Sequence, residues 1–243
     1  MIDNLKKYEY YRTDMGVLYH GDCLEIMPHL PKVDLVLTDP PYGAEKFTND
    51  KLKLIKSNIK KWALFITEIC RKQLFVFCDY RSIHYWMIFL SENKKLSFRN
   101  IILWHKELGG SSKRYYPRKT EYILWYVASE KYTFSPKKIK CSSQMLKGKM
   151  KNITDLWEIP SINNMAKERI GHPTQKPIYL IEQIIVSHGL DTEKILDPFL
   201  GSGTTAVACE RLNRHWIGIE IEEKYCEIAA QRIENERKQR KLF

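Results

Sequence analysis

The strongest constraint on the fold is an alternation of short apolar runs with amphipathic stretches along the 243 residues. Runs such as Val33–Thr38 (VDLVLT) and Leu74–Cys78 (LFVFC) are typical of buried strands. We expect strands at residues 17–20, 33–38, 74–78, 98–104, 121–128, 195–196 and 215–221. The stretches between them predict helices at residues 23–27, 62–71, 83–90, 177–187, 204–212 and 223–238. Strands that alternate with helices predict an α/β domain with a largely parallel sheet.

One segment breaks this alternation. Residues Glu45–Lys61 are polar, basic and poorly periodic, so we interpret them as a mobile loop. A mass of 28.9 kDa is that of one domain, or of one domain with a small insertion. We therefore expect residues 1–243 to form a single domain.

Four of the expected strands end in acidic residues or Gly/Pro turns. The acidic residues at these ends are Asp22, Asp39, Asp197 and Glu220. In parallel α/β sheets, ligands bind outside the carboxyl ends of the strands. The four positions therefore predict one acidic cleft at a single edge of the sheet.

The strand at residues 33–38 runs into Asp39-Pro40-Pro41-Tyr42. Consecutive prolines fix the backbone and remove two donors, and a residue before proline is held extended. The Asp39 carboxylate and the Pro40 carbonyl are then two acceptors that match the two hydrogens of a planar –NH2 group. Tyr42 adds a face for stacking. The motif predicts a holder for an exocyclic amine on an aromatic ring, although a plain strand-ending turn also explains D-P-P-Y by itself.

A glycine-rich turn, Asp197–Thr205 (DPFLGSGTT), joins an expected strand to an expected helix. Glycines let the backbone approach a ligand closely, and a helix N-terminus offers free N–H groups to negative charge. The next strand ends at Glu220, a position where an acid accepts hydrogen bonds from ribose hydroxyls in dinucleotide folds. The turn matches neither G-x-G-x-x-G nor the phosphate-binding loop. A ribose-containing ligand is therefore expected here.

A third motif, His172–Pro177 (HPTQKP), comes directly before an expected helix that Pro177 starts. Thr174 and Lys176 lie at the start of that helix, where a hydroxyl and an ammonium hold a small carboxylate. A loop followed by a helix cap explains the same residues without any ligand. Both interpretations stay open for the motif taken alone.

Together the three motifs resemble those of the β-class amino DNA methyltransferases, which use S-adenosylmethionine. Asp39–Tyr42 matches the catalytic D-P-P-Y of that family, and Asp197–Thr205 matches its cofactor motif, D-P-F-x-G-S-G-T-T. His172–Pro177 matches the H-P-T-Q-K-P that precedes the cofactor motif. The catalytic motif comes first here, which is the circularly permuted motif order of this class. The resemblance covers residues 16–232.

The resemblance implies a Rossmann-like class I methyltransferase fold, with a mostly parallel seven-stranded sheet and helices on both faces. It implies S-adenosylmethionine as the cofactor and gives roles to matching positions. The implied catalytic residues are Asp39, Pro40, Pro41 and Tyr42. The implied cofactor-binding residues are Asp22, Thr174, Lys176, Asp197, Phe199, Gly201, Ser202, Gly203, Thr204 and Glu220. In this assignment Asp22 faces the adenine of the cofactor, and Thr174 and Lys176 contact its carboxylate.

The implied activity is site-specific methylation of the exocyclic N6 of an adenine flipped out of the DNA stack. D-P-P-Y is typical of adenine-N6 enzymes, and S-P-P-Y of most cytosine-N4 enzymes. Both amines present the same two hydrogens, so cytosine-N4 methylation stays an alternative. Methylases of RNA or of protein amides usually place the cofactor motif first. The alternative of another class is a non-catalytic subunit that binds S-adenosylmethionine and DNA, against which the intact motifs argue.

Positive charge is concentrated in the middle of the chain. Residues 43–170 hold 26 basic and 11 acidic side chains, whereas residues 1–42 hold 4 and 7 and residues 171–243 hold 10 and 11. Phosphate contacts dominate nucleic-acid affinity, so this segment predicts a surface for double-stranded DNA. We expect residues 108–170 to form an inserted target-recognition region. The expected DNA contacts are Lys113, Arg114, Arg118 and Lys119. The resemblance also makes a homodimer an expectation.

Other sequence features narrow the class further. No apolar run approaches the roughly 20 residues of a membrane helix, and the polar N-terminus lacks the apolar stretch of a signal peptide. None of the six cysteines forms a C-x-x-C pair. We therefore expect a cytoplasmic protein with reduced cysteines and neither membrane nor metal. No nuclease motif is visible, so any restriction activity of a restriction–modification pair would belong to another chain.

Overall fold

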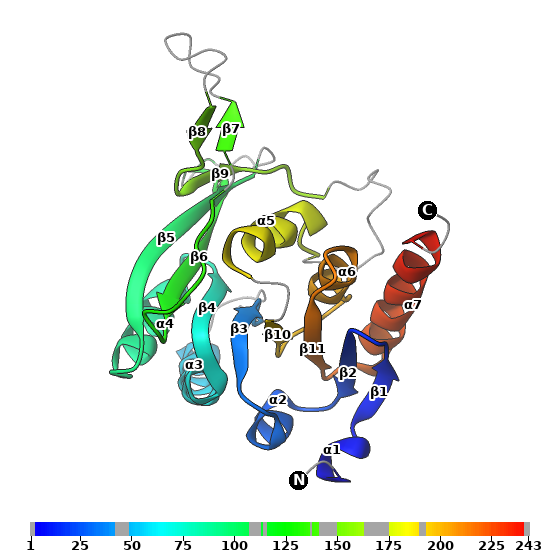
Figure 1. The fold of residues 1–243 in the computed structure, drawn as a ribbon. Coiled ribbons are helices and arrows are strands. Elements are labelled where there is room, and N and C mark those ends of the chain that lie inside the picture. The colour runs from blue at the N-terminus through cyan, green and yellow to red at the C-terminus, as the bar shows by residue number, and fades with distance from the viewer. Residues whose placement is uncertain are drawn as a thin grey trace.

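The computed structural model describes residues 3–41, 49–106, 113, 116–136, 138–140, 150–162, 175–189 and 193–240. Its centre is a nine-stranded sheet in the order β1-β2-β11-β10-β3-β4-β6-β5-β9 (Figure 1). These strands are β1 (Glu9–Arg12), β2 (Gly16–His20), β3 (Val33–Thr38), β4 (Cys70–Cys78), β5 (Ser97–His105), β6 (Thr120–Val127), β9 (Leu156–Glu158), β10 (Lys194–Asp197) and β11 (His215–Glu220). A separate two-stranded sheet pairs β7 (Lys138–Lys140) with β8 (Met150–Asn152).

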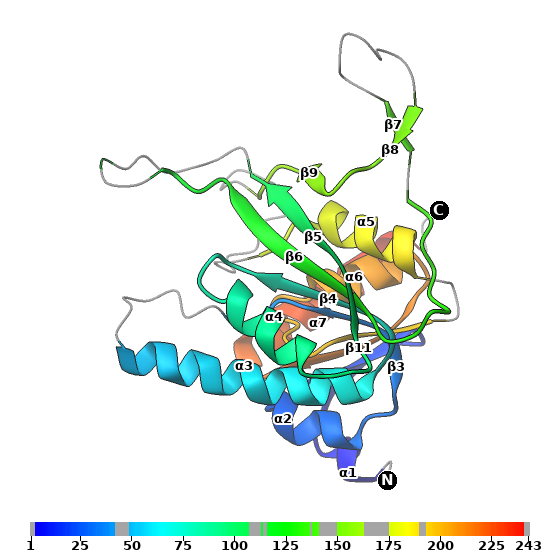
Figure 2. The same ribbon diagram turned by 90° about the vertical axis from the view of Figure 1, so that its left-hand side faces the viewer.

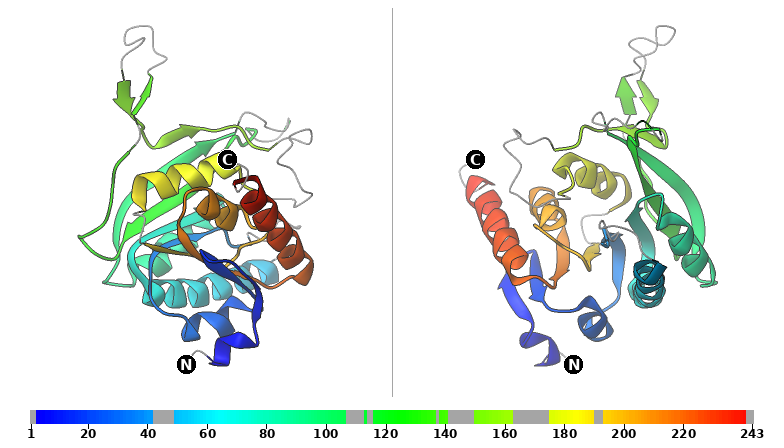
Figure 3. Two further views of the ribbon diagram at one scale, coloured as in Figure 1. Left: turned by 45° about the vertical axis from the view of Figure 1, so that its right-hand side comes forward. Right: turned by 180° about the vertical axis from the view of Figure 1, so that it is seen from behind.

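All seven strands expected from the sequence are present. They are β2, β3, β4, β5, β6, β10 and β11, and the short strands β1 and β9 extend the sheet at its two edges. The neighbours β2, β11, β10, β3 and β4 pair in parallel, whereas β6 is antiparallel to both β4 and β5. Figure 3 shows β1 and the β5–β6 pair at opposite sides of the molecule. The expected largely parallel sheet is therefore confirmed.

Helices cover both faces of this sheet. One face carries α2 (Cys23–Ile26), α3 (Asn49–Ile69) and α4 (Ile83–Ser91), with α1 (Asp3–Lys6) and a 3-10 turn (Met27–His29) nearby. The other face carries α5 (Ile178–His188), α6 (Thr204–Arg211) and α7 (Glu223–Arg240). Alternate side chains of one strand serve the two layers, because successive residues of a strand point to opposite faces. Phe75 and Phe77 of β4 join the second layer, whereas Leu74 and Val76 join the first.

The loop expected at residues 45–61 is wrong from residue 49 onward. Helix α3 begins at Asn49 and lies along one face of the sheet (Figure 2). Ile59, Ala63 and Ile66 are buried at helical spacing, and Ile55 packs against the same core. Lys56, Lys60 and Lys61 lie among these residues, so the basic composition hid a narrow apolar stripe.

The expected target-recognition region, residues 108–170, mixes core and peripheral structure. It contains β6, which lies inside the central sheet, as well as the β7–β8 pair, which projects away from the body of the molecule (Figures 1 and 2). A large part of the region, including residues 108–112 and 141–149, lies outside the described residues. Among the helices that the structure describes, none is long and apolar enough to cross a membrane.

A buried histidine closes one end of the α5 layer. The ring of His188 lies 4.7 Å from the rings of both Phe75 and Trp125 and 5.2 Å from that of Phe134. Its Nδ1 lies 3.0 Å from the Ile184 carbonyl oxygen, so Nδ1 carries the proton of the neutral ring. Burial lowers the pKa of His188 to about 4, because the aromatic surroundings cannot solvate an imidazolium.

This histidine predicts a loss of stability in acid. Its pKa in the folded chain lies below the value of roughly 6.5 for an exposed imidazole, so only the unfolded chain takes up the proton as the pH falls from about 6.5 to about 4. We expect the free energy of unfolding to fall by about 3 kcal/mol over this range from His188 alone. In His188→Phe this part of the pH dependence should vanish, as measured by urea denaturation at several pH values. His29→Gln, at an exposed position, is the control, and an unchanged slope in His188→Phe would contradict the assignment.

Candidate active site

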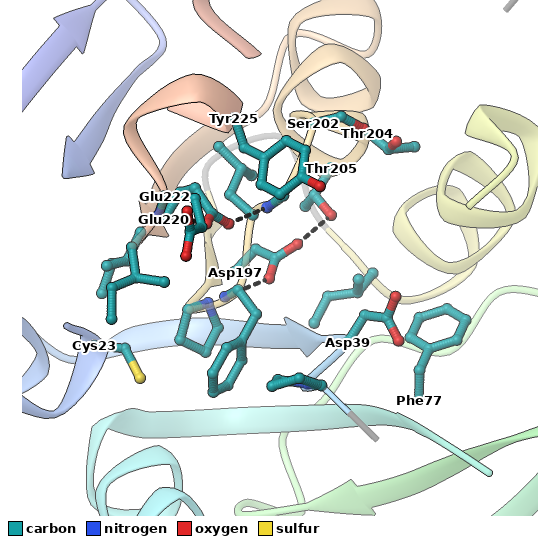
Figure 4. Close-up of a pocket in the computed structure, with 18 of the residues that line it drawn as sticks. Cys23, Asp39, Phe77, Asp197, Ser202, Thr204, Thr205, Glu220, Glu222 and Tyr225 are labelled. Carbon is teal, nitrogen blue, oxygen red and sulfur yellow. Dashed lines mark hydrogen bonds between the residues drawn. The ribbon is translucent and has the colours of Figure 1, made fainter. Parts of the chain in front are cut away.

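The four acidic residues expected at strand ends meet at one edge of the sheet. β2, β11, β10 and β3 are consecutive parallel neighbours, so their carboxyl ends lie side by side. A cavity of about 620 Å³ opens at this edge, and Asp22, Asp39, Asp197 and Glu220 all line it (Figure 4). This volume is in the range of small-molecule and cofactor sites.

Asp197 organises the glycine-rich turn that follows β10. One carboxylate oxygen accepts a hydrogen bond from the Phe199 amide at 3.0 Å, and the other accepts one from Thr205 Oγ1 at 2.6 Å. Gly201 and Gly203 have φ angles of 54° and 85°, a left-handed conformation that favours glycine. Burial raises the pKa of Asp197 to about 7, although both hydrogen bonds oppose this shift.

Glu220 ends β11 on the opposite side of the same turn. Its two carboxylate oxygens accept hydrogen bonds from the Gly201 and Glu222 amides, both at 2.8 Å (Figure 4). Burial raises the pKa of Glu220, against the effect of these amide donors. Each carboxylate oxygen has more than one acceptor site, so the group also has capacity for ligand hydroxyls.

Helix α7 packs against the glycine-rich turn at residues 201–204. Arg232 Nη1 donates to the Ser202 carbonyl oxygen at 2.7 Å and lies 3.2 Å from the hydroxyls of Ser202 and Thr204. Ala229 of the same helix packs so closely on Gly203 that a Cβ added there would lie 2.8 Å from the Ala229 Cβ. Neither Arg232 nor Ala229 was identified from the sequence, because only the contact between α7 and the turn distinguishes them from other residues of a charged helix.

The remaining walls of the cavity are partly apolar. The rings of Trp62 and Phe199 pack edge to face at 4.9 Å and line one side together with Leu24. Asp22 caps α2, since its side chain accepts a hydrogen bond from the Leu24 amide at 2.8 Å, and it lines the cavity as well. Trp62 was not among the expected site residues, because it lies on α3, far from any motif in the sequence.

The D-P-P motif lies at the β3 end of the cavity. Asp39 and Pro41 line it, and Pro40 is buried. Tyr42 lies outside the described residues, as do Thr174 and the first two residues of the H-P-T-Q-K-P motif. Their expected roles therefore stay predictions.

Lys176 lies against the D-P-P motif. Its side chain is 7% exposed, and its Nζ is 2.5 Å from Asp39 Oδ2. The same Nζ lies 5.4 Å from the centre of the Phe77 ring. The sequence predicted that Lys176 contacts the carboxylate of a cofactor. In the structure Lys176 lines the acidic cavity and pairs there with Asp39.

Two further charged residues continue this arrangement. Glu121 Oε2 lies 3.4 Å from Lys176 Nζ, and Glu121 Oε1 pairs with Lys106 Nζ. Glu121 is the second residue of β6, and Lys106 directly follows β5. Because β6 runs antiparallel, its first residues meet the ends of β3, β4 and β5 at the same edge. Nothing in the sequence indicated this cluster, since its members lie far apart along the chain.

The neighbouring opposite charges keep these buried groups ionised. Burial by itself would raise the pKa of Glu121, but Lys176 and Lys106 outweigh it and hold that pKa below its usual value. Burial by itself would likewise lower the pKa of Lys176, but Asp39 and Glu121 raise it above its usual value. Glu121 is therefore a carboxylate and Lys176 an ammonium at neutral pH.

Two of the expected DNA contacts, Arg118 and Lys119, directly precede β6 at the same edge of the sheet. Lys113, Arg118 and Lys119 are exposed, and Arg114 lies outside the described residues. The guanidinium of Arg118 lies 3.9 Å from the centre of the Tyr80 ring, in the segment that follows β4. Tyr116, in the same segment as Arg118, is 96% exposed. Cationic and aromatic groups therefore flank the opening on the β4–β6 side.

Fold and site together define a class I methyltransferase with an acidic cavity beside a D-P-P motif. The DNA methylase family model matches residues 33–231, which is most of the chain. The chain therefore belongs to the DNA methylase family, whose members are N6 and N4 methyltransferases.

Individual relatives agree with this membership. The type II methyltransferase M.BglII of Bacillus subtilis is 30% identical over 93% of this chain and 71% of its own length. The DNA adenine methyltransferase YhdJ of Escherichia coli (strain K12) is 27% identical over 92% of this chain and 84% of its own. The crystal structure of an M1.HpyAVI–SAM complex superposes with a TM-score of 0.67 at 33% identity, covering 90% of this chain and 99% of that one.

The contact between Gly203 and Ala229 generates a prediction about the turn. Gly203→Ala should lower the free energy of unfolding by about 2–4 kcal/mol. The new Cβ would be strained by the left-handed backbone of residue 203 and would overlap the Cβ of Ala229. Adding Ala229→Gly should relieve the overlap but not the backbone strain. Urea denaturation of both single variants and the double variant measures this coupling, and strict additivity would contradict the contact.

Proposed function

We propose that this chain is a site-specific DNA methyltransferase that transfers a methyl group from S-adenosylmethionine to the exocyclic N6 of adenine. The observation that carries the proposal is that Asp39 of the D-P-P motif lines the acidic cavity. The chain in which this occurs belongs to the DNA methylase family. The amine-holding motif and the ribose-binding motif thus meet in one site.

The residues of the cavity fit S-adenosylmethionine. Asp22, Asp39, Asp197, Glu220 and Glu222 line it with Lys176 as the one basic residue among the described lining, which favours a cationic ligand. Glu220 is in position to receive ribose hydroxyls, and Trp62 and Phe199 offer apolar surface to an aromatic ring. The turn at residues 201–204 would lie under the methionine part. When bound, the cofactor supplies an electrophilic methyl group on a sulfonium sulfur.

The chain's own residues would prepare the amine. A base must leave the duplex to reach Asp39 at the edge of the sheet. The Asp39 carboxylate and the Pro40 carbonyl would then accept one N–H each, which favours a more tetrahedral nitrogen with an available lone pair. Such fixed acceptors lower the barrier mainly by positioning and by electrostatic stabilisation.

The basic face on the β4–β6 side is the proposed DNA surface. Arg118 and Lys119 are exposed there, and they directly precede Thr120 and Glu121, the first two residues of β6. We assign target recognition to residues 108–170, of which the projecting β7–β8 pair is one part. The homodimer expected from the family resemblance stays a prediction.

The D-P-P-Y sequence favours adenine over cytosine as the target base. Long-read sequencing of DNA from cells that express the chain gives the modified base and its context together. N6-methyladenine in a defined short context is the expected result. N4-methylcytosine would move the chain to the other branch of the family, and unmodified DNA would favour a non-catalytic binding subunit.

Asp39 provides a direct mutational test. Asp39→Asn replaces one acceptor by an amide donor, so we expect the rate of methyl transfer to fall at least ~100-fold while the cofactor still binds. Single-turnover transfer of a radiolabelled methyl group and isothermal titration with the cofactor measure the two quantities. Asp34→Asn, near the other end of β3, is the control. Normal turnover in Asp39→Asn would refute the role of the motif.

Charge reversal tests the DNA surface. Arg118→Glu with Lys119→Glu should weaken DNA binding several-fold and reduce its dependence on salt by about one released counterion per lost phosphate contact. Cofactor affinity should stay unchanged. Lys94→Glu, at an exposed turn on the opposite edge of the sheet, is the matched control. Equal DNA affinity in all variants, measured by fluorescence anisotropy, would show the basic segment to be ordinary solvated surface.

A further inference from the structure

Four charged side chains alternate in sign along the carboxyl edge of the sheet. They are Asp39, Lys176, Glu121 and Lys106. Asp39 follows β3, Glu121 begins β6 and Lys106 follows β5, so the row crosses the sheet above the end of β4. Lys176 reaches this row from the segment before α5, over the ring of Phe77. One ammonium is thus shared between the D-P-P acid and a second acid.

The two acids hold this ammonium unequally. Lys176 Nζ is 2.5 Å from Asp39 Oδ2 but 3.4 Å from Glu121 Oε2. Glu121 Oε2 is fully buried and makes no hydrogen bond within the described part of the chain. Its partner oxygen is already paired with Lys106. Glu121 therefore presents a fixed, ionised acceptor with unused capacity towards Lys176.

Binding of a target amine would disturb this arrangement. The amine needs the Asp39 carboxylate as an acceptor, and the Lys176 ammonium, which donates to Oδ2, competes with the amine for that oxygen. Lys176 is 7% exposed and cannot reach bulk water without leaving its buried position. A buried ammonium without a carboxylate is strongly disfavoured, so it needs a second partner nearby.

On the basis of the proposed function, we propose that Glu121 is a positioning residue that takes up the Lys176 ammonium when the target amine replaces it on Asp39. Glu121 then contacts neither the base nor the reacting atoms. It acts by making the exchange at Asp39 possible, and Lys106 fixes its side chain for that purpose. The total charge of the row is unchanged by the exchange.

Glu121→Gln tests this proposal. The substitution keeps the shape of the side chain but leaves Asp39 as the one carboxylate, among the described residues, that is paired with Lys176, so Lys176 should hold Asp39 more firmly. We expect kcat for DNA methylation to fall at least roughly tenfold, while the cofactor Kd and the KM for DNA stay within about twofold. Glu130→Gln, an exposed residue just beyond the other end of β6, should behave as the unchanged chain. An unchanged kcat in Glu121→Gln would overturn the proposal.

A second variant separates positioning from simple charge balance. Glu121→Gln leaves Lys106 without its partner, whereas Glu121→Gln combined with Lys106→Gln restores a neutral site. The proposal predicts that kcat stays low in the double variant, and this variant also serves if the single variant does not fold. Recovery of kcat to the level of the unchanged chain would mean that Glu121 only balances Lys106. Failure of the proposed function would appear differently, as absence of methyl transfer in the unchanged chain itself.

Discussion

Parallel pairing of β2, β11, β10 and β3 is the constraint on which the site depends. It places Asp22, Asp39, Asp197 and Glu220 at one edge, although the residues come from distant parts of the chain. Each carboxylate comes at or just after the carboxyl end of its strand, which is where ligands bind in parallel α/β sheets. Moving any of these strands would separate the D-P-P motif from the other acids of the cavity.

The same parallel pairing concentrates carboxylates at one edge of the sheet, where burial makes their negative charges unfavourable. The structure accommodates these carboxylates in two different ways. In the cavity, burial raises the pKa of Asp197 and Glu220, and backbone amides offset only part of that cost. Beside the cavity, Lys176 and Lys106 compensate Asp39 and Glu121 directly. The first arrangement leaves room for a positively charged ligand, whereas the second contains its own cations. The boundary between the two lies at Asp39, which belongs to both.

Sequence reasoning identified what is local and missed what depends on packing. The seven main strands, the turn at residues 197–205 and the cavity-lining acids follow from short patterns with known backbone consequences. The first part of helix α3, up to residue 61, was missed because lysines interrupt its narrow apolar stripe, whereas its end was expected as a helix from residue 62. The cluster of Glu121 and Lys106 and the support of the turn by Arg232 depend on which elements meet, and residue spacing carries no sign of that. For Lys176, the motif correctly predicted a place just before a helix, but it gave no sign of the ion pair with Asp39.

The central claim is that the acceptors after β3 hold an amine of DNA, which takes a methyl group from S-adenosylmethionine bound in the neighbouring cavity. Its most direct test uses the purified chain, duplex DNA and S-adenosylmethionine with a deuterated methyl group, followed by nucleoside mass spectrometry. The account predicts the deuterated methyl group on N6 of deoxyadenosine. Label on no nucleoside, with the cofactor bound and the DNA bound, would contradict it.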